Sequence, residues 1–332
     1  MKKMFKHRYG LQFLTIIILF LIVPKFLSNA DSTYLYDDWS YSQEIIIPFD
    51  TSKELAKFQP IDTPIFFHNP CWAKNEIQHS IRVICQKAKE NIELECQIYG
   101  LNYSYKEHIK SCNLVFLIPE EADGSERYFV YYDDSEKDKP DYIDHVKIPD
   151  YIDHVKIEES YYRYEPIPGY SLESNYYKIL DDNYLPYGVS YEGQFMGYNT
   201  CQHVLRLKDG VTEALPKNIE LFAAFDFKYS YEKGLFGYSS TSQKLLSKEI
   251  LTDGNLMLEF RIVSTSKYND LKTTAAYKYY HCPSVDSRIH VHVKHETLEQ
   301  ITVTSESPAT NTDGVFASLQ AGGVKSRSIQ DL

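Results

Sequence analysis

The stretch Asn91-Ile92-Glu93-Leu94-Glu95-Cys96-Gln97-Ile98 alternates polar and apolar residues without a break. A period of two is typical of a β-strand with one buried face, because successive side chains point to opposite sides of a sheet. Residues 80–85 alternate in the same way, and the charged residues between the two segments predict a hairpin turn. The sequence therefore predicts a sheet in this region.

Neighbouring segments extend this sheet into a module. Residues 45–47 predict a strand that stops at Pro48, and 127–132 predict a closing strand. Residues 113–118 form a continuous apolar run, which suits a strand buried on both faces. We therefore predict a first β-sandwich module over 37–133.

Several short motifs in this module carry a resemblance. In chain order they are Trp39-Ser40-Tyr41, Ile45-Ile46-Ile47, Ile81-Arg82-Val83, Leu114-Val115-Phe116 and the aromatic strand 128–132. Residues 39–133 thus resemble a β-sandwich module near the N-terminus of secreted bacterial and archaeal proteins. Some of these belong to a jelly-roll-like family of unknown function, and others are exo-acting rhamnogalacturonan lyases. The resemblance implies a β-sandwich and a connection with glycans, but its motifs carry no catalytic residue.

A linker over 134–158 contains a tandem repeat. The string PDYIDHVKI fills 140–148 and again 149–157. Because nine is odd, two copies in one continuous strand would present opposite faces, so we expect one copy in a loop or an edge extension. A cation site is the alternative for the repeat, although its spacing matches no calcium loop. That site would use Asp141, Asp144, His145, Asp150, Asp153 and His154.

Strand signals continue over 159–303 and predict a second, larger β-sandwich. Asp253-Gly254-Asn255 lies between two β-prone runs and predicts a hairpin. The predicted fold class is all-β, with two consecutive jelly-roll-like or super-sandwich-like units after an N-terminal signal or anchor helix. The polar segment 304–332 is a tail or the start of a missing region.

A second predicted hairpin joins 274–281 to 288–294. If His281 lies opposite Arg288, six side chains share one face. They are Tyr277, Tyr279, His281, Arg288, His290 and His292. We call this set the predicted ledge.

Three interpretations fit the predicted ledge. It is a solvated or inter-sheet polar face, a glycan-binding surface on which tyrosine rings stack against sugars, or a catalytic or metal site. The third would use His290 and His292, with Glu259 or His281 as a further ligand. We predict no bound metal or cofactor.

The N-terminus predicts export. Lys2, Lys3, Lys6 and Arg8 precede the apolar run 11–23, and Ser28-Asn29-Ala30 offers a cleavage site. Cleavage after Ala30 would release the protein, whereas retention would anchor it to the outer face of the membrane, so 1–30 is a signal peptide or an anchor. Five of the 35 basic residues lie in this segment, so the remainder has 30 basic against 46 acidic residues. That balance argues against a nucleic-acid partner.

The six cysteines and one sequon agree with export. An even number of cysteines favours disulfides, with Cys71, Cys85, Cys96 and Cys112 as the nearest candidates, and buried free thiols are the alternative. Asn102-Tyr103-Ser104 is a candidate glycosylation site. We therefore predict a secreted or cell-surface, non-catalytic protein that contacts extracellular carbohydrate. The alternative is a lyase or hydrolase that acts on an acidic glycan through the predicted ledge.

Overall fold

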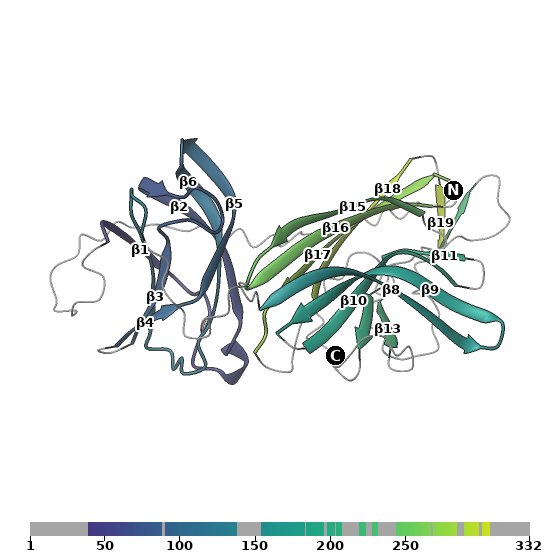
Figure 1. The fold of residues 1–332 in the computed structure, drawn as a ribbon, viewed down its shortest axis with the longest axis horizontal. Helices are drawn as coiled ribbons and strands as arrows, with labels where there is room; N and C mark the ends of the chain where they lie inside the picture. Colours follow the sequence, from purple (N-terminus) through teal and green to yellow (C-terminus); the bar gives the residue numbers. More distant parts are fainter. Residues whose placement is uncertain are drawn as a thin grey trace, which may run out of the picture. The chain divides into compact units, whose positions relative to one another are not determined.

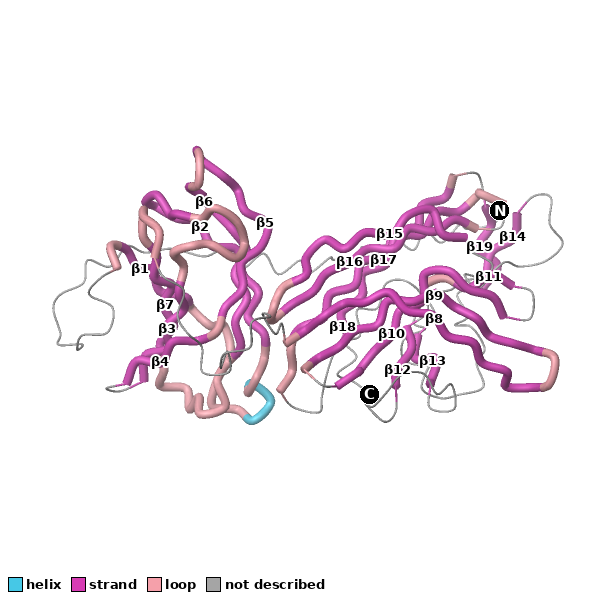
Figure 2. The backbone as a smooth tube through the Cα atoms, in the orientation of Figure 1, coloured by secondary structure: helices cyan, strands magenta, loops and turns pink. Residues whose placement is uncertain are grey.

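The computed structural model describes residues 39–87, 90–137, 154–182, 184–195, 198–202, 204–207, 219–223, 228–231, 244–266, 268–283, 289–298 and 301–305. Within these ranges the chain is almost all β-strand, with one 3₁₀ turn, η1 (Glu54–Ala56) (Figures 1 and 2). The predicted all-β class is confirmed.

Seven strands form the first sandwich. One antiparallel sheet has the order β1 (Tyr41–Ile45), β7 (Arg127–Tyr132), β3 (Arg82–Lys87), β4 (Glu90–Leu94). The other has the order β2 (Pro60–Trp72), β6 (His108–Leu117), β5 (Cys96–Tyr105). Alternating residues of both sheets, such as Val83, Val130, Leu114 and Phe116, fill one fully buried core, which is the expected packing of a sandwich.

The alternating stretch 91–98 is not one strand. β4 ends at Leu94 and pairs with β3, whereas β5 begins at Cys96 and pairs with β6. The chain therefore changes sheets at Glu95, which lies between the two strands. Alternation alone does not reveal such a crossing, because the buried face stays on the same side when two sheets share a core.

The second sandwich contains a sheet with the order β13-β12-β10-β9-β8, to which β11 adds on β10. Its facing sheet has the order β15-β16-β17-β18, and β14 pairs separately with β19. The bounds are β8 (Val155–Ile167), β9 (Tyr170–Asp181), β10 (Tyr184–Phe195), β11 (Tyr198–Thr200), β12 (Val204–Leu207), β13 (Ile219–Ala223), β14 (Lys228–Tyr231), β15 (Lys244–Asp253), β16 (Met257–Thr265), β17 (Leu271–Tyr280), β18 (Ile289–Thr297) and β19 (Ile301–Ser305).

Aromatic rings fill the core of the second sandwich. Phe260 stacks on Tyr277 with centroids 4.9 Å apart, and Tyr177 of the facing sheet meets Phe260 edge-on at 5.1 Å. Phe260 and Tyr277 are fully buried. Part of the high tyrosine content therefore serves packing, since a tyrosine ring buries a large apolar area.

The end of the second repeat copy belongs to the second sandwich. Val155–Ile157, the end of the second copy, forms the start of β8, which is an edge strand of its sheet. The second sandwich thus begins before the predicted residue 159. The first copy and residues 149–153 lie outside the described residues.

Gln97 of β5 binds the β15–β16 hairpin of the second sandwich. Both sandwiches belong to one compact unit, Leu35–Leu332. The Gln97 amide donates to the Met257 carbonyl at 3.0 Å and accepts from the Leu256 and Met257 N–H groups at 2.9 and 2.7 Å. A Cβ atom on Gly254 would overlap the amide of the Gln97 side chain, so glycine at this position leaves room for the contact. The side chain thus completes the backbone hydrogen bonding of the hairpin.

The predicted disulfides are wrong. All six cysteines lie in the described ranges and all are free thiols, with Cys71, Cys85, Cys96 and Cys112 buried in the core of the first sandwich. Burial raises the pKa of the Cys71 thiol to about 12 and that of Cys85 to about 11. These cysteines act as small apolar core residues.

Among the described residues, no helix has the length and apolar character needed to cross a membrane. The apolar run 11–23 lies outside those residues.

Candidate functional site

The predicted ledge does not form, because the strand register differs by one residue. β17 and β18 do pair antiparallel, but Tyr279 lies opposite Ile289 and Tyr277 opposite Val291. His290 and His292 lie opposite Lys278 and Ala276 instead. A one-residue shift moves every side chain of one strand to the other face.

The observed register has a clear physical cause. It places Tyr277 and Tyr279 in the core beside Ile289, and both rings are fully buried. The predicted register would have buried Lys278 with the apolar side of β18, and burial of an unpaired ammonium group is costly. In the structure Lys278 forms an ion pair with Glu259 at 3.3 Å.

The six residues of the predicted ledge therefore do not share one face of the sheet. His290 and His292 are exposed, whereas His281 is buried at the end of β17 with 6% of its surface accessible. Arg288 lies outside the described residues. Glu259 and His281, the two predicted further ligands, do not join His290 and His292 in a group of metal-binding type among the described residues.

A fourth histidine, His295, belongs to β18 and lies on the strand face that is directed toward the core. Its ring nitrogen lies 2.9 Å from the Thr273 hydroxyl, and burial lowers the pKa of His295 to about 4. The unfolded chain takes up a proton near the ordinary pKa of 6.5, whereas the folded chain does so only near 4. The stability that neutral His295 provides is therefore present at pH 7 and declines as the pH falls below about 6.5.

We expect the free energy of unfolding to lose about 2 kcal/mol between pH 7 and pH 5 through this residue. Urea denaturation of the wild type and His295→Gln at both pH values measures the difference. His292→Gln is the matched control, because His292 is exposed on the same strand. Equal pH dependence in the wild type and His295→Gln would contradict the assignment.

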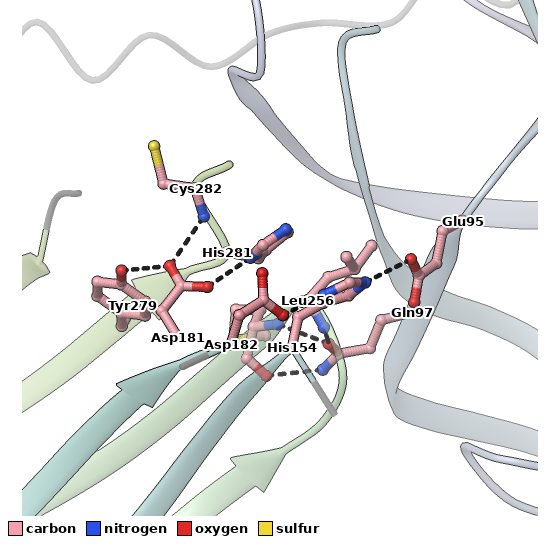
Figure 3. A network of polar contacts seen from close by, with 10 residues as sticks. Glu95, Gln97, His154, Asp181, Asp182, Leu256, Tyr279, His281 and Cys282 are labelled. Atoms are coloured by element: carbon pink, nitrogen blue, oxygen red, sulfur yellow. Dashed lines mark hydrogen bonds and ion pairs between the residues drawn. The ribbon is translucent and has the colours of Figure 1, made fainter. Parts of the chain in front are cut away.

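A network of polar side chains surrounds His281. The carboxylate of Asp181, at the end of β9, accepts hydrogen bonds from His281 Nδ1 at 2.5 Å, from the Tyr279 hydroxyl at 2.6 Å and from the Cys282 backbone N–H at 3.0 Å (Figure 3). Asp181 has only 4% of its surface accessible. This carboxylate fixes the ring orientation of His281, with Nδ1 toward Asp181 and Nε2 on the opposite side of the ring.

His154 lies beside His281 and likewise contacts carboxylates. Its Nδ1 lies 2.7 Å from Asp182 Oδ1, and its Nε2 lies 3.0 Å from Glu95 Oε2 (Figure 3). Asn255 also donates a hydrogen bond to Glu95. The hydrogen bond with Glu95 and that with Asp182 raise the pKa of His154 to about 9, so the ring is an imidazolium at neutral pH when no metal competes for it.

The two histidine rings stack on each other. Their centroids are 4.2 Å apart and their planes differ by 15°. His154, Asp182 and His281 each offer one ligand atom, and these three atoms lie within 4.8 Å of one another. We call His154, Asp182 and His281, together with Asp181 and Glu95, the carboxylate–histidine cluster.

Backbone contacts hold the cluster in place. The Asp182 N–H donates to the His154 carbonyl at 2.5 Å, and the His281 N–H donates to the Leu256 carbonyl at 2.8 Å. Asp182 has a positive φ of 50°, which Asp tolerates better than most residues. The sequence pattern pointed to His154 and His281 in separate sets and gave no signal for Asp181, Asp182 or Glu95. Asp181 and Asp182 lie in a turn signal, and turns are usually rich in solvated Asp.

A pair of exposed tyrosines lies at the β5–β6 hairpin. Tyr105 is 54% exposed and stacks on the His108 ring, with centroids 4.3 Å apart and an interplanar angle of 19°. Tyr103 is 45% exposed, and its hydroxyl donates to the Lys74 carbonyl at 2.9 Å. We call Tyr103, Tyr105 and His108 the aromatic hairpin. Asn102, the candidate glycosylation residue, is exposed on the same strand.

No relative of this chain was found among known proteins. No protein-family model matches the chain, and neither the curated proteins nor the solved structures gave a significant match.

Proposed function

We propose that this chain is an exported, non-catalytic β-sandwich protein that contacts extracellular carbohydrate through the aromatic hairpin. The signal-like N-terminus supports a location outside the cell or on the outer face of its membrane, and the resemblance of residues 39–133 supports a connection with glycans. The observation that carries the proposal is the pair of exposed tyrosine rings, Tyr103 and Tyr105, on one short strand end.

The geometry of the hairpin suits contact with a sugar ring. A tyrosine offers a flat apolar face and a hydroxyl, and it loses little conformational entropy on binding because it has few rotatable bonds. Hydrogen bonding of Tyr103 to Lys74 and stacking of Tyr105 on His108 further restrict both rings. Such fixed aromatic faces lower the entropic cost of binding.

A glycan-array screen of the purified protein tests this function. We expect binding to at least one polysaccharide class, and about a tenfold loss of affinity in Tyr105→Ala or Tyr103→Ala for the loss of one stacking face. Tyr161→Ala is the matched control, because Tyr161 is 53% exposed on β8 of the second sandwich. Absence of any glycan hit, or equal loss in Tyr161→Ala, would refute the proposal.

The alternative function is an enzyme that acts on an acidic polysaccharide. The buried Asp181–His281 pair favours it, because such a pair can move a proton. However, Tyr277 and Tyr279, which the sequence offered for this role, are fully buried, and His281 is nearly so. We therefore expect no cleavage of any polysaccharide that the protein binds. Cleavage that is lost in His281→Gln would favour the enzyme over the non-catalytic binding protein.

A further inference from the structure

We propose that His154, Asp182 and His281 bind a divalent first-row transition metal ion, with zinc as the representative. This inference is independent of the carbohydrate proposal. It starts from the donor set, because two imidazoles and one carboxylate suit zinc and its neighbours, whereas calcium and magnesium prefer oxygen ligands.

The strongest support is that each histidine has a carboxylate bound to its other ring nitrogen. The two rings stack within 15° of parallel, so one ring has to turn for both lone pairs to point at a single ion. His281 has its Nδ1 bound to Asp181, so Nε2 is the nitrogen that remains for a metal. His154 has its Nε2 bound to Glu95, so Nδ1, which faces Asp182, is the equivalent donor. Histidines that bind metals usually donate their other N–H to a carboxylate or carbonyl, and here each histidine has its own carboxylate partner.

The distance between two of the three ligand atoms already matches that of a bound state. Two donors on one zinc ion lie about 3 Å apart, since each metal–ligand bond is about 2 Å long. His154 Nδ1 and Asp182 Oδ1 are 2.7 Å apart, so they already meet this condition. One ligand atom from each of His154, Asp182 and His281 lies within 4.8 Å of the other two, so the longest separation has to shorten by up to about 2 Å to reach the donor spacing on one ion. The ion would replace the proton that His154 and Asp182 share.

The ligands come from three separate parts of the second sandwich. His154 precedes β8, Asp182 follows β9, and His281 follows β17 of the facing sheet. An ion bound here would therefore connect the two sheets at one end of the sandwich. Three protein ligands leave a coordination position for water or another small donor.

Metal titration of the purified protein, after treatment with a chelator, tests the proposal. We expect one zinc ion per chain by calorimetry and a rise in melting temperature with zinc concentration, because the ion binds the folded state. Cobalt in place of zinc should give a visible absorption band.

Asp182→Asn should weaken zinc binding at least tenfold without loss of folding, since Asp182 is exposed. Glu95→Gln, which removes a partner of a ligand, should weaken it by about 10–100-fold.

The tandem repeat offers a matched control. His145 has the same sequence neighbours as His154, nine residues earlier. Binding should be lost in His154→Gln and retained in His145→Gln and His292→Gln. The proposal is overturned if zinc does not bind at micromolar concentrations, if Asp182→Asn binds like the wild type, or if His145→Gln loses binding to the same extent as His154→Gln.

Discussion

Asp181→Ala is expected to destabilise the protein by about 3–5 kcal/mol. The substitution removes three accepted hydrogen bonds and leaves the Tyr279 hydroxyl and His281 Nδ1 buried without their carboxylate. Each buried polar group that loses its partner costs about 1–3 kcal/mol. Urea denaturation should show a lower midpoint with an unchanged slope, because the loss affects the folded state and not the surface exposed on unfolding.

The neighbouring residue provides the control. Asp182→Gly removes a carboxylate whose side chain is 50% exposed, and glycine accepts the positive φ of this position. Its cost in the absence of metal should stay below about 1 kcal/mol, since exposed ion pairs contribute little. If Asp181→Ala costs no more than Asp182→Gly, Asp181 does not organise the cluster.

The second large effect is expected at the contact between the two sandwiches. Gln97→Ala removes three hydrogen bonds and leaves the backbone groups of Leu256 and Met257 without them. Gln97 has only 5% of its surface accessible, so water cannot replace these bonds without entering the contact. We expect a loss of about 2–4 kcal/mol in the free energy of unfolding. Denaturation measured by tyrosine and tryptophan fluorescence reports it.

A double-mutant cycle isolates this contact. Gly254→Ala introduces a Cβ atom into the space that the Gln97 side chain occupies, so it should displace the same hydrogen bonds. The double variant should therefore be little worse than Gln97→Ala alone, because residues in contact do not behave additively. Gln194→Ala, on the exposed part of β10, is the surface control and should change stability by less than about 0.5 kcal/mol. Strict additivity of Gln97→Ala and Gly254→Ala would contradict the contact.

Local sequence patterns were enough to locate several strands. Residues 80–85, 113–118 and 127–132 correspond to β3, β6 and β7, and the turn at Asp253-Gly254-Asn255 joins β15 to β16. Alternation could not show that 91–98 crosses between sheets at Glu95, because Leu94 before the crossing and Cys96 and Ile98 after it all face the same core. Pairing partners of distant strands are likewise set by the tertiary fold.

The predicted ledge is wrong because the sequence between 281 and 288 does not determine the register of the two strands that it joins. The sequence did contain a better guide: Lys272 and Lys278 share one face of β17, so the opposite face, with Tyr277 and Tyr279, has to be the buried one. The carboxylate–histidine cluster was beyond reach for another reason. Its residues lie at strand ends that are up to 186 residues apart, and only the assembled sandwiches bring Glu95 to His154 and Asp181 to His281.

The position of His154 in the second copy of the repeat has a consequence for variation in chain length. Removal of either nine-residue copy leaves the same sequence, in which one PDYIDHVKI string leads directly into Glu158 and the rest of β8. A histidine therefore always stands immediately before the Val-Lys-Ile that starts the edge strand. Gain or loss of a copy changes the number of residues between β7 and β8 and leaves a histidine at the position of His154.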